Sequence, residues 1–552
     1  MEIIGYTFNY NGYRIIIEDY EVTLIEKNEY IEYFVGDYGA VGDGVTSDFE
    51  AIQRAVDDCY SNGGGVVTFD GNKTYLLKRP SDWSTDSAHH TSCAINLKPG
   101  VNIEGNGCTI EWYHTNGVFN TNSRERIANT VARLTENVEK DANYIVVDST
   151  ENYSIGDTIV LFGEDNETGD KYETKDWMFN KIVNIDGKKI YLENKVNFKI
   201  DLNLCGQTGS LNTGIYNGAI MKVNIYENTF IRNFTISNHG NGRGASIYLA
   251  FAKNVTLENI TGDNLYQSVT SLQFSENCIL DKYIIKNFYG DTLGHGTLQI
   301  YECKNVSIQD SLFDNFYGLV LGGESYNKNI TIDNCEININ NENLSNLTSS
   351  TNRYSIINQT IGCSLYIKDT KFNCSFDDMY IIAHNFVKDC TVEYENITIQ
   401  TNNKFNLLWI YTDQIKGTLN LVCNGKTQIL DFDKPQEIEI TLSKEEIQSS
   451  NYLKKIIMEK KILPIEIELI SYNNCNIDDI QSIYYGESNY PTIKLKEEYF
   501  DNNEAFKGRS WGKSENGPNL FLQYNPFISI TWNDTVEKSA SINIKLKYVE
   551  MN

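Results

Sequence analysis

One short pattern recurs between residues 228 and 397 and limits the possible folds more than any other feature of the chain. The pattern is Asn-x-x-(Ile/Leu)-x-(Asn/Asp/Lys), and its first residue recurs after 26, 23, 28 and 24 positions. A repeat of this length, built from short β-branched strands between Asn, Asp and Gly residues, is typical of a solenoid whose units stack around one continuous core. The pattern therefore predicts a parallel β-helix with one coil per repeat. The five copies begin at Asn228, Asn254, Asn277, Asn305 and Asn329.

Each copy alternates apolar and polar residues with the period of a β-strand. In the copy at Asn305, a single polar residue separates Val306 from Ile308, so both apolar side chains are expected to point inward. The leading Asn then falls at a corner of the coil, where Asn tolerates a left-handed backbone. Equivalent corners of stacked coils lie about 4.8 Å apart, which allows their side-chain amides to form a hydrogen-bonded ladder. We therefore expect a structural role for these Asn residues.

Length and charge narrow the functional classes. A chain of 552 residues can hold two or three domains, or one long solenoid with appendages. A formal charge of −27 argues against nucleic acid or an anionic membrane as a partner, because either would be repelled. The sequence shows neither an apolar run of about 18 residues nor the basic and apolar regions of a secretory signal. The 12 Cys have no metal-type spacing, and several occupy inward repeat positions, so we expect reduced thiols in a chain folded in the cytoplasm.

The stretch from residue 34 to residue 69 carries the most specific signal. Ser47 and Glu50 match a capping box at the start of a helix over about 48–60, and Gly63 begins the Gly run that ends it before a new strand. A helix in this place is expected to close the open apolar end of the solenoid. The stretch resembles the N-terminal cap of the pectate-lyase-like superfamily, in the form shared by polygalacturonase-type enzymes and bacteriophage tail spikes. This resemblance covers roughly residues 34–400 and implies an all-β, right-handed parallel β-helix.

The same reading divides the chain into three parts. Residues 1–30 are expected to form a small β element or adaptor, residues 31–400 the β-helix, and residues 401–552 a β-sandwich-like domain for ligand or trimer contact. Residues from about 132 to 196 interrupt the repeat and are expected to form an antiparallel β insertion, as occurs in phage-type members of the superfamily. Trp177 on this insertion either overhangs a ligand groove or packs on the flank. A short helix is expected from Ser443 toward Lys461.

Two stretches resemble polygalacturonase motifs. Gly262-Asp263 follows a repeat strand where that family has Gly-Asp-Asp, and His295 stands between two glycines as in its Gly-His-Gly turn. The resemblance implies that Asp263 is the general acid and that His295 orients or tunes the acid–base pair. The sequence departs from the family at Asn264, which replaces the second Asp, and at residues 319–321, where Leu-Val-Leu replaces the strand that binds the substrate carboxylate.

Further candidates lie on the same coils. Carboxylates on adjacent coils would approach the spacing of retaining glycosidases, and carboxylates two coils apart that of inverting ones. A lyase is the alternative, with a Lys or Arg base assisted by His295 or Tyr301. No calcium-loop spacing is present, and we expect neither metal nor cofactor. Besides Asp263 and His295, the catalytic candidates are Asp291, Asp314 and Glu324, and the substrate-binding candidates are His239, Arg243, Tyr266, Tyr289 and Tyr301.

Together these features predict a homotrimeric phage tail-spike or appendage protein of the virion. Its expected partners are a host cell-surface polysaccharide, which it binds and cleaves, and other virion tail or neck proteins. Two alternatives stay open on the same fold. One is a structural or receptor-binding virion protein without catalytic activity, and the other is a bacterial polysaccharide hydrolase or lyase.

Overall fold

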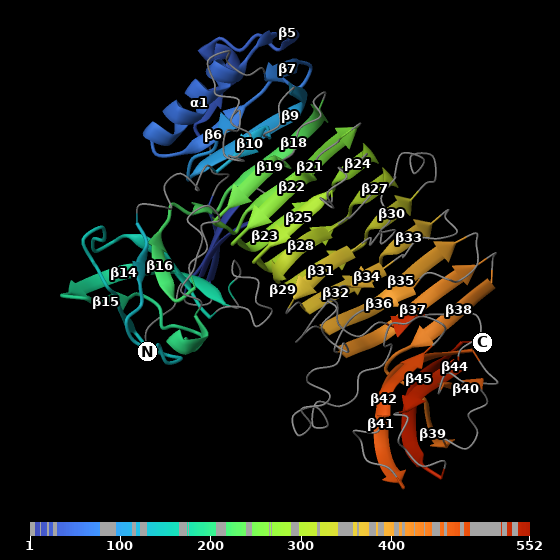
Figure 1. Cartoon of the computed structure of the whole chain (residues 1–552). Coiled ribbons are helices and arrows are strands. Elements are labelled where there is room, and N and C mark those ends of the chain that lie inside the picture. Colours follow the sequence, from blue (N-terminus) through green and yellow to red (C-terminus); the bar gives the residue numbers. More distant parts are fainter. Residues whose placement is uncertain are drawn as a thin grey trace.

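The structure is a computed structural model of the chain (Figure 1). It describes residues 6–10, 13–18, 21–25, 30–77, 95–112, 117–121, 130–164, 174, 176–205, 217–238, 245–263, 265, 268–288, 297–316, 321–339, 357–361, 364–374, 382–384, 391–401, 408–410, 414–423, 426–434, 436–443, 453–457, 461–474, 480–485, 520–521, 527–532 and 539–551.

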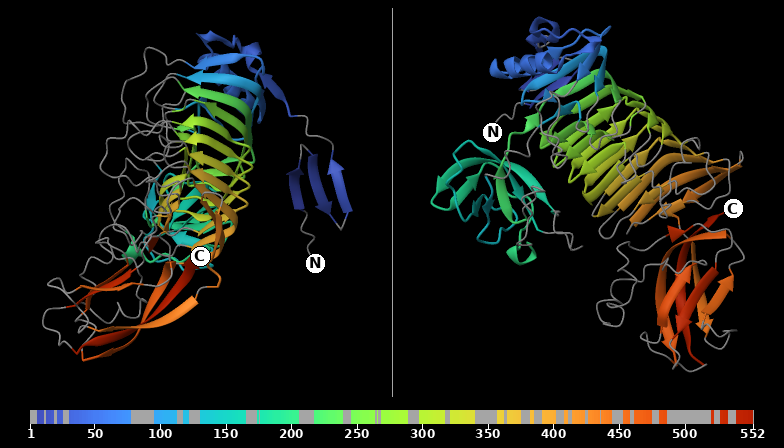
Figure 2. Two further views of the ribbon diagram at one scale, coloured as in Figure 1. Left: turned by 90° about the vertical axis from the view of Figure 1, so that its right-hand side faces the viewer. Right: turned by 45° about the horizontal axis from the view of Figure 1, so that its top comes forward.

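Two large sheets form the body of the molecule, and almost all their strands pair in parallel. In Figure 2 the coils stack along one axis. The seven-stranded sheet contains β8 (Ile95–Asn96), β10 (Phe119–Asn120), β19 (Ala245–Ala250), β22 (Ser268–Gln273), β25 (Leu298–Tyr301), β28 (Leu321–Tyr326) and β31 (Ile357–Ile361). The 20-stranded sheet contains β4 (Glu32–Phe34), β5 (Asp43–Ser47), β6 (Gly65–Thr68), β7 (Thr74–Leu77), β9 (Val101–Trp112), β17 (Tyr226–Glu227), β18 (Phe230–Asn238), β20 (Ala252–Lys253), β21 (Thr256–Asp263), β23 (Glu276–Asp281), β24 (Ile284–Phe288), β26 (Lys304–Gln309), β27 (Leu312–Phe316), β29 (Lys328–Asp333), β30 (Glu336–Ile339), β32 (Ser364–Lys368), β33 (Lys371–Cys374), β35 (Thr391–Thr401), β37 (Gln414–Cys423) and β38 (Lys426–Asp431).

Each repeat supplies strands to both sheets and pairs with the repeat before and after it. One coil, for example, runs through β22, β23 and β24, and each of these strands pairs in parallel with its equivalent in the next coil. This pairing is that of a parallel β-helix and confirms the predicted fold class. The alternation also places the predicted side chains inside, since Val306 and Ile308 are at most 1% exposed in one continuous core.

The predicted Asn ladder is present. The five leading Asn residues have φ between 52° and 56°, which is the left-handed region. Their amides join successive coils with Nδ2···Oδ1 distances of 2.9–3.0 Å, and the Oγ of Ser364 donates to the last of them at 3.2 Å. The ladder keeps the corners in register, and this register fixes which outward side chains become neighbours.

The N-terminal cap is the helix α1 (Phe49–Ser61), close to the expected range of 48–60, whereas the expected capping box of Ser47 and Glu50 stays a prediction. The residue before the helix is Asp48, whose side chain makes no capping hydrogen bond. Asp48 is 1% exposed, and its carboxylate instead accepts backbone N–H bonds from Val41 at 2.6 Å, Gly42 at 3.3 Å and Leu76 at 3.2 Å. The carboxylate therefore joins the loop before the helix to β7.

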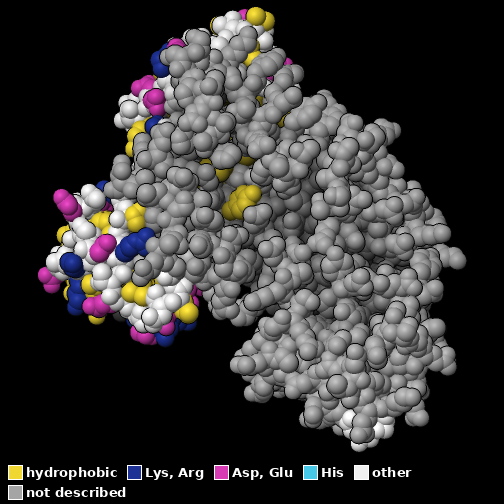
Figure 3. Space-filling view, in the orientation of Figure 1, with side chains coloured by type: hydrophobic (Ala, Val, Ile, Leu, Met, Phe, Trp, Pro, Cys, Tyr) yellow, Lys and Arg dark blue, Asp and Glu magenta, His cyan; other side chains and the backbone are white. Residues whose placement is uncertain are grey.

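The insertion is an antiparallel sheet with its own core. Its strands, in sheet order, are β11 (Ala132–Arg133), β16 (Ala219–Lys222), β13 (Thr158–Phe162), β14 (Trp177–Asp186), β15 (Lys189–Leu192) and β12 (Tyr144–Val146). The sheet extends beyond the expected end near residue 196, because β16 pairs with both β11 and β13. Its outward side chains mix both charge signs in the space-filling view (Figure 3). The limits of the three predicted domains stay predictions.

The two ends of the chain also contain antiparallel sheets. At the N-terminus, β1 (Tyr6–Tyr10), β2 (Tyr13–Glu18) and β3 (Glu21–Ile25) form one sheet. Coil stacking continues past residue 400, since β37 still pairs in parallel with β35. The remaining strands of this region include β34 (Ile382–His384), β36 (Leu408–Ile410) and β43 (Leu520–Phe521) in one small sheet, β39 (Gln436–Ser443), β45 (Ser541–Met551) and β41 (Lys461–Asn473) in a second, and β40 (Leu453–Ile457), β44 (Phe527–Trp532) and β42 (Ile480–Tyr485) in a third.

The helix expected from Ser443 toward Lys461 is wrong over its described part. Residues 453–457 form β40, which pairs antiparallel with β44. Pairing with a distant strand prevails here over the local helix signal. Within the described residues, no helix is both long and apolar enough to cross a membrane. Of the cysteines whose side chains the structure describes, none is joined in a disulfide, and the expected reduced state stays a prediction.

Candidate functional site

The predicted site residues divide into three groups. His239, Arg243, Tyr266, Tyr289, Asp291 and His295 lie outside the described residues. Asp263 and Asp314 belong to the 20-stranded sheet, whereas Tyr301 and Glu324 belong to the seven-stranded sheet.

Asp263 and Asp314 share one column of the 20-stranded sheet. The strand register places Asp263 beside Lys286, and Lys286 beside Asp314. Their neighbours Ile285 and Phe313 are fully buried, so the column faces outward. Lys286 is exposed and Asp314 is half-buried. The two aspartates are therefore two coils apart in one register column, with Lys286 between them.

The column continues as a row of amides. The register of β27 with β30 leads from Asp314 to Asn338, and β30 pairs with β33 so that Asn338 lies beside Asn373. Asn373 Nδ2 donates to Asn338 Oδ1 at 2.5 Å and to Glu336 Oε1 at 3.0 Å. We call Asp263, Lys286, Asp314, Asn338 and Asn373 the polar strip. Lys286 and both amides were not among the residues predicted from the sequence. The alternation of apolar and polar residues along each strand predicts that these three side chains point outward. It does not predict which residues of the neighbouring coils lie beside them.

The spacing of the strip fits acid–base chemistry. Strands of a sheet lie about 4.8 Å apart, so equivalent positions two coils apart are separated by roughly 9.6 Å along the axis. Side chains that converge from such positions can reach the ~6.5–9.5 Å of inverting glycosidases, whose gap holds a water molecule. A cation between the aspartates would favour a negatively charged species in that gap.

Glu324 and Tyr301 lie on strands of the other large sheet, and their expected roles stay predictions. Glu324 lies on β28, and Tyr301 ends β25 with its side chain half-buried. Both strands belong to the seven-stranded sheet, whereas the polar strip lies on the 20-stranded sheet. The backbone therefore places both residues on a different sheet from the polar strip.

Trp177 packs on the flank, which was one of the two alternatives. It is 1% exposed, and its indole N–H donates to the backbone oxygen of Glu302 at 2.7 Å. Around it, the insertion joins the coils through an apolar cluster that includes Phe162, Phe179, Phe251 and Phe274. A buried indole held in this way cannot overhang a groove.

The structure also joins Glu258, Asp281 and Lys282 at the next corner. Lys282 Nζ lies 3.0 Å from Glu258 and 3.1 Å from Asp281. Hydrogen bonds to Glu258 and then Asp281 raise the pKa of Lys282. This ammonium already has two carboxylate partners, so we assign it to the coil-to-coil structure. The part of the chain that the structure describes contains no group of three or more His, Cys, Asp or Glu arranged to hold a metal ion.

Comparison with known proteins gives short similarities. No family model matches the chain. The capsule KN3-specific depolymerase 1 of Klebsiella phage KN3-1 is 50% identical over 92 residues, which are 16% of this chain and 12% of the depolymerase. Mannuronan C5-epimerase AlgE2 of Azotobacter vinelandii is 28% identical over 163 residues, which are 28% of this chain and 13% of the epimerase. The chain therefore spans only about an eighth of the length of each of these curated relatives.

Among solved structures, the tailspike gp61 of Pseudomonas phage phi297 matches with a TM-score of 0.36 and 9% identity. That alignment covers 94% of this chain and 99% of the tailspike. A TM-score of this size carries no weight for function, and the fold assignment rests on the strand register described above.

Proposed function

We propose that this chain is a phage tail-spike or appendage protein that binds and depolymerises a host cell-surface polysaccharide. The observation that carries the proposal is the polar strip, in which Asp263, Lys286 and Asp314 stand in register on successive coils. The stretch that is 50% identical to a capsule-specific depolymerase supports a polysaccharide as the substrate. A position in the virion tail, contacts with other virion proteins and a homotrimer belong to the same proposal, and light scattering tests the trimer directly.

The proposed reaction is hydrolysis with Asp263 as the acid and Asp314 as the base. Asp314 accepts a proton from water while the water oxygen bonds to the anomeric carbon. The bond from that carbon to the glycosidic oxygen breaks, and the oxygen takes the proton of Asp263. Lys286 lies between the two aspartates. It stabilises the charged carboxylate of Asp314 before the reaction and that of Asp263 after it. The amides of Asn338 and Asn373 offer hydrogen bonds to sugar hydroxyls along the strip.

A lyase is the second candidate, and Lys286 is the observation that favours it. A neutral Lys286 amine would remove the proton α to the carboxylate of a uronate. A carbon–carbon double bond forms as the glycosidic bond breaks, and the leaving oxygen takes a proton from water.

The test is incubation of the protein with surface polysaccharides of candidate hosts, followed by mass spectrometry of the products. Hydrolysis adds one water per cleavage, whereas elimination leaves dehydrated ends. Asp263→Asn and Asp314→Asn should each lower cleavage by at least 100-fold if they supply acid and base, an effect within the ~10²–10⁴ of general acid–base catalysis. Asp333→Asn is the matched control, because Asp333 ends β29 outside the strip.

Three outcomes would redirect the proposal. Cleavage that survives both strip variants removes the site assignment. Loss of cleavage in Lys286→Met with dehydrated wild-type products favours the lyase. Binding of a polysaccharide without any product favours an adhesin.

A further inference from the structure

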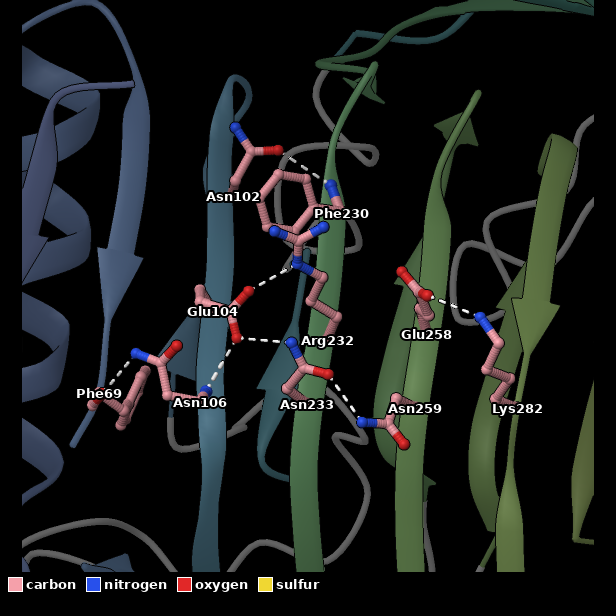
Figure 4. A network of polar contacts seen from close by, with 10 residues as sticks. All are labelled: Phe69, Asn102, Glu104, Asn106, Phe230, Arg232, Asn233, Glu258, Asn259 and Lys282. Carbon is pink, nitrogen blue, oxygen red and sulfur yellow. Dashed lines mark hydrogen bonds and ion pairs between the residues drawn. The ribbon is translucent and has the colours of Figure 1, made fainter. Parts of the chain in front are cut away.

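A fixed arginine lies one coil and one corner away from the polar strip. Arg232 and Phe230 are on β18, which pairs with β21, the strand that ends at Asp263. Figure 4 shows the Arg232 guanidinium across the ring of Phe230, with Glu104 of β9 on its other side. The proposed function does not use these residues.

Glu104 holds the guanidinium by one edge. Its Oε2 lies 2.6 Å from Arg232 Nε, while its Oε1 accepts from the Asn106 backbone N–H at 2.8 Å and from Asn233 Nδ2 at 2.7 Å. Glu104 is only 9% exposed, so three donors fix its carboxylate in place. Arg232 Nε is thereby fixed as well.

The ring of Phe230 holds the guanidinium by one face. The central carbon of the guanidinium lies 4.2 Å from the ring centroid, which is a cation–π contact. The ring is itself positioned, since the Phe230 backbone N–H donates to Asn102 Oδ1 at 3.0 Å and Tyr30 meets the ring at 6.1 Å in an edge arrangement. Asn102 is buried, and its own Nδ2 is bound to a backbone oxygen at 2.9 Å.

The remaining edge of the guanidinium is open. The Arg232 side chain is 40% exposed, and within the described residues neither Nη1 nor Nη2 donates a hydrogen bond. A guanidinium has five N–H donors in a rigid fork that matches a carboxylate in a bidentate way. Because the fork is held before any ligand arrives, binding would lose little side-chain entropy.

We propose that Arg232, Phe230 and Tyr30 form a subsite for a carboxylate-bearing sugar of the polysaccharide. The Nη1–Nη2 edge binds the sugar carboxylate, and the 36% exposed ring of Tyr30 offers an apolar surface to the pyranose. The inference deepens the proposed function and rests on it for the polymeric substrate. It also assigns the acidic-sugar contact to a place other than residues 319–321, where the sequence lacks such a contact.

The first experiment measures binding of hexagalacturonate and of a neutral galactose hexamer to the full chain by calorimetry. The wild type should bind hexagalacturonate at least 10-fold tighter. Arg232→Gln should remove this preference, and Arg232→Lys should remove most of it, because an ammonium lacks the planar fork. Lys282→Gln is the matched control. Lys282 is 54% exposed on the same face, but its ammonium is already bound by two carboxylates.

A second measurement needs no variant and therefore does not depend on the folding of Arg232→Gln. The carboxyl groups of hexagalacturonate are reduced to alcohols, and the wild type should then bind the product no better than the neutral hexamer. Equal wild-type affinity for acidic and neutral hexamers would overturn the proposal. Equal losses in Arg232→Gln and Lys282→Gln would also overturn it, because they would indicate a general charge effect.

The two proposals fail in different ways. If host polysaccharide is cleaved and Arg232→Gln changes neither cleavage nor hexagalacturonate binding, the subsite is wrong and the function stands. If Arg232→Gln abolishes hexagalacturonate binding while no host polysaccharide is bound or cleaved, the subsite stands and the polysaccharide function is wrong.

Discussion

Lys304 makes the attachment of the insertion dependent on pH. Its ammonium lies 4.5 Å from the ring centroid of Trp177 and donates to the Trp177 backbone oxygen. Burial lowers the pKa of Lys304 to about 8, an effect that Lys328 reinforces and that Asp176, Glu276 and Glu302 oppose. In the unfolded chain a lysine has a pKa of about 10.4. At pH values between these two pKa values, the unfolded state binds more protons than the folded state. The free energy of unfolding should therefore rise as the pH increases from about 8 to about 10.

The size of the effect follows from the difference between the two pKa values. A difference of about 2.4 units corresponds to about 3 kcal/mol at 1.36 kcal/mol per unit. Solvent reaches a partly buried ammonium, so we expect about 2 kcal/mol. The assay is urea unfolding followed by tryptophan fluorescence at pH values from about 7 to about 10, for the wild type and Lys304→Met. The variant should lack the rise, whereas Lys189→Met, which removes an ammonium 4.4 Å from the ring centroid of Tyr144, should keep it. Parallel curves for the wild type and Lys304→Met would refute the reasoning.

Three further predictions concern the β-helix. Asn277→Ala should lower the free energy of unfolding by about 2 kcal/mol, because it breaks two ladder hydrogen bonds and places Ala at a φ of 56°. Asn277→Gly should lower it less, because Gly tolerates that φ, and urea midpoints measure both changes. Asp48→Ala should cost about 3 kcal/mol, since it leaves several buried N–H groups unpaired, and hydrogen exchange should increase in α1 and β7. Iodoacetamide should modify Cys205 before Cys278, because burial raises the pKa of the Cys278 thiol to about 12. Peptide mass spectrometry of the folded protein measures both rates, and equal rates would contradict this prediction.

The coils could be predicted from the sequence because their corners have local chemistry. Each repeat contains an Asn with φ near 55° and two inward apolar residues that are two positions apart, so the pattern can be recognised within a single repeat. The cap helix had the same kind of signal, since its apolar face and terminal glycines are local. The role of Asp48 had no local sequence signal, because it depends on the N–H of Leu76, which is 28 residues away.

The polar strip could not be predicted in the same way. Lys286 stands 23 residues after Asp263 and 28 before Asp314, and only the coil lengths decide that the three share a column. The sheet to which Glu324 belongs could not be predicted for the same reason. Glu324 lies 10 residues after Asp314, but the coil turns between them into the other sheet. Trp177 left both outcomes open because its packing partners, including Phe274, lie on distant coils.

The overall charge of −27 and the two proposed binding surfaces are compatible because they act over different distances. At physiological salt, charges more than about 8 Å apart are largely screened from one another. The electrostatic interaction of a bound sugar is then determined by the charged groups nearest to it. Around Arg232, the carboxylate of Glu104 lowers the local positive charge, but it also aims the guanidinium. Uronate binding through this fork should therefore tolerate the acidic surface at physiological salt and weaken at very low salt, where repulsion from the rest of the molecule is no longer screened.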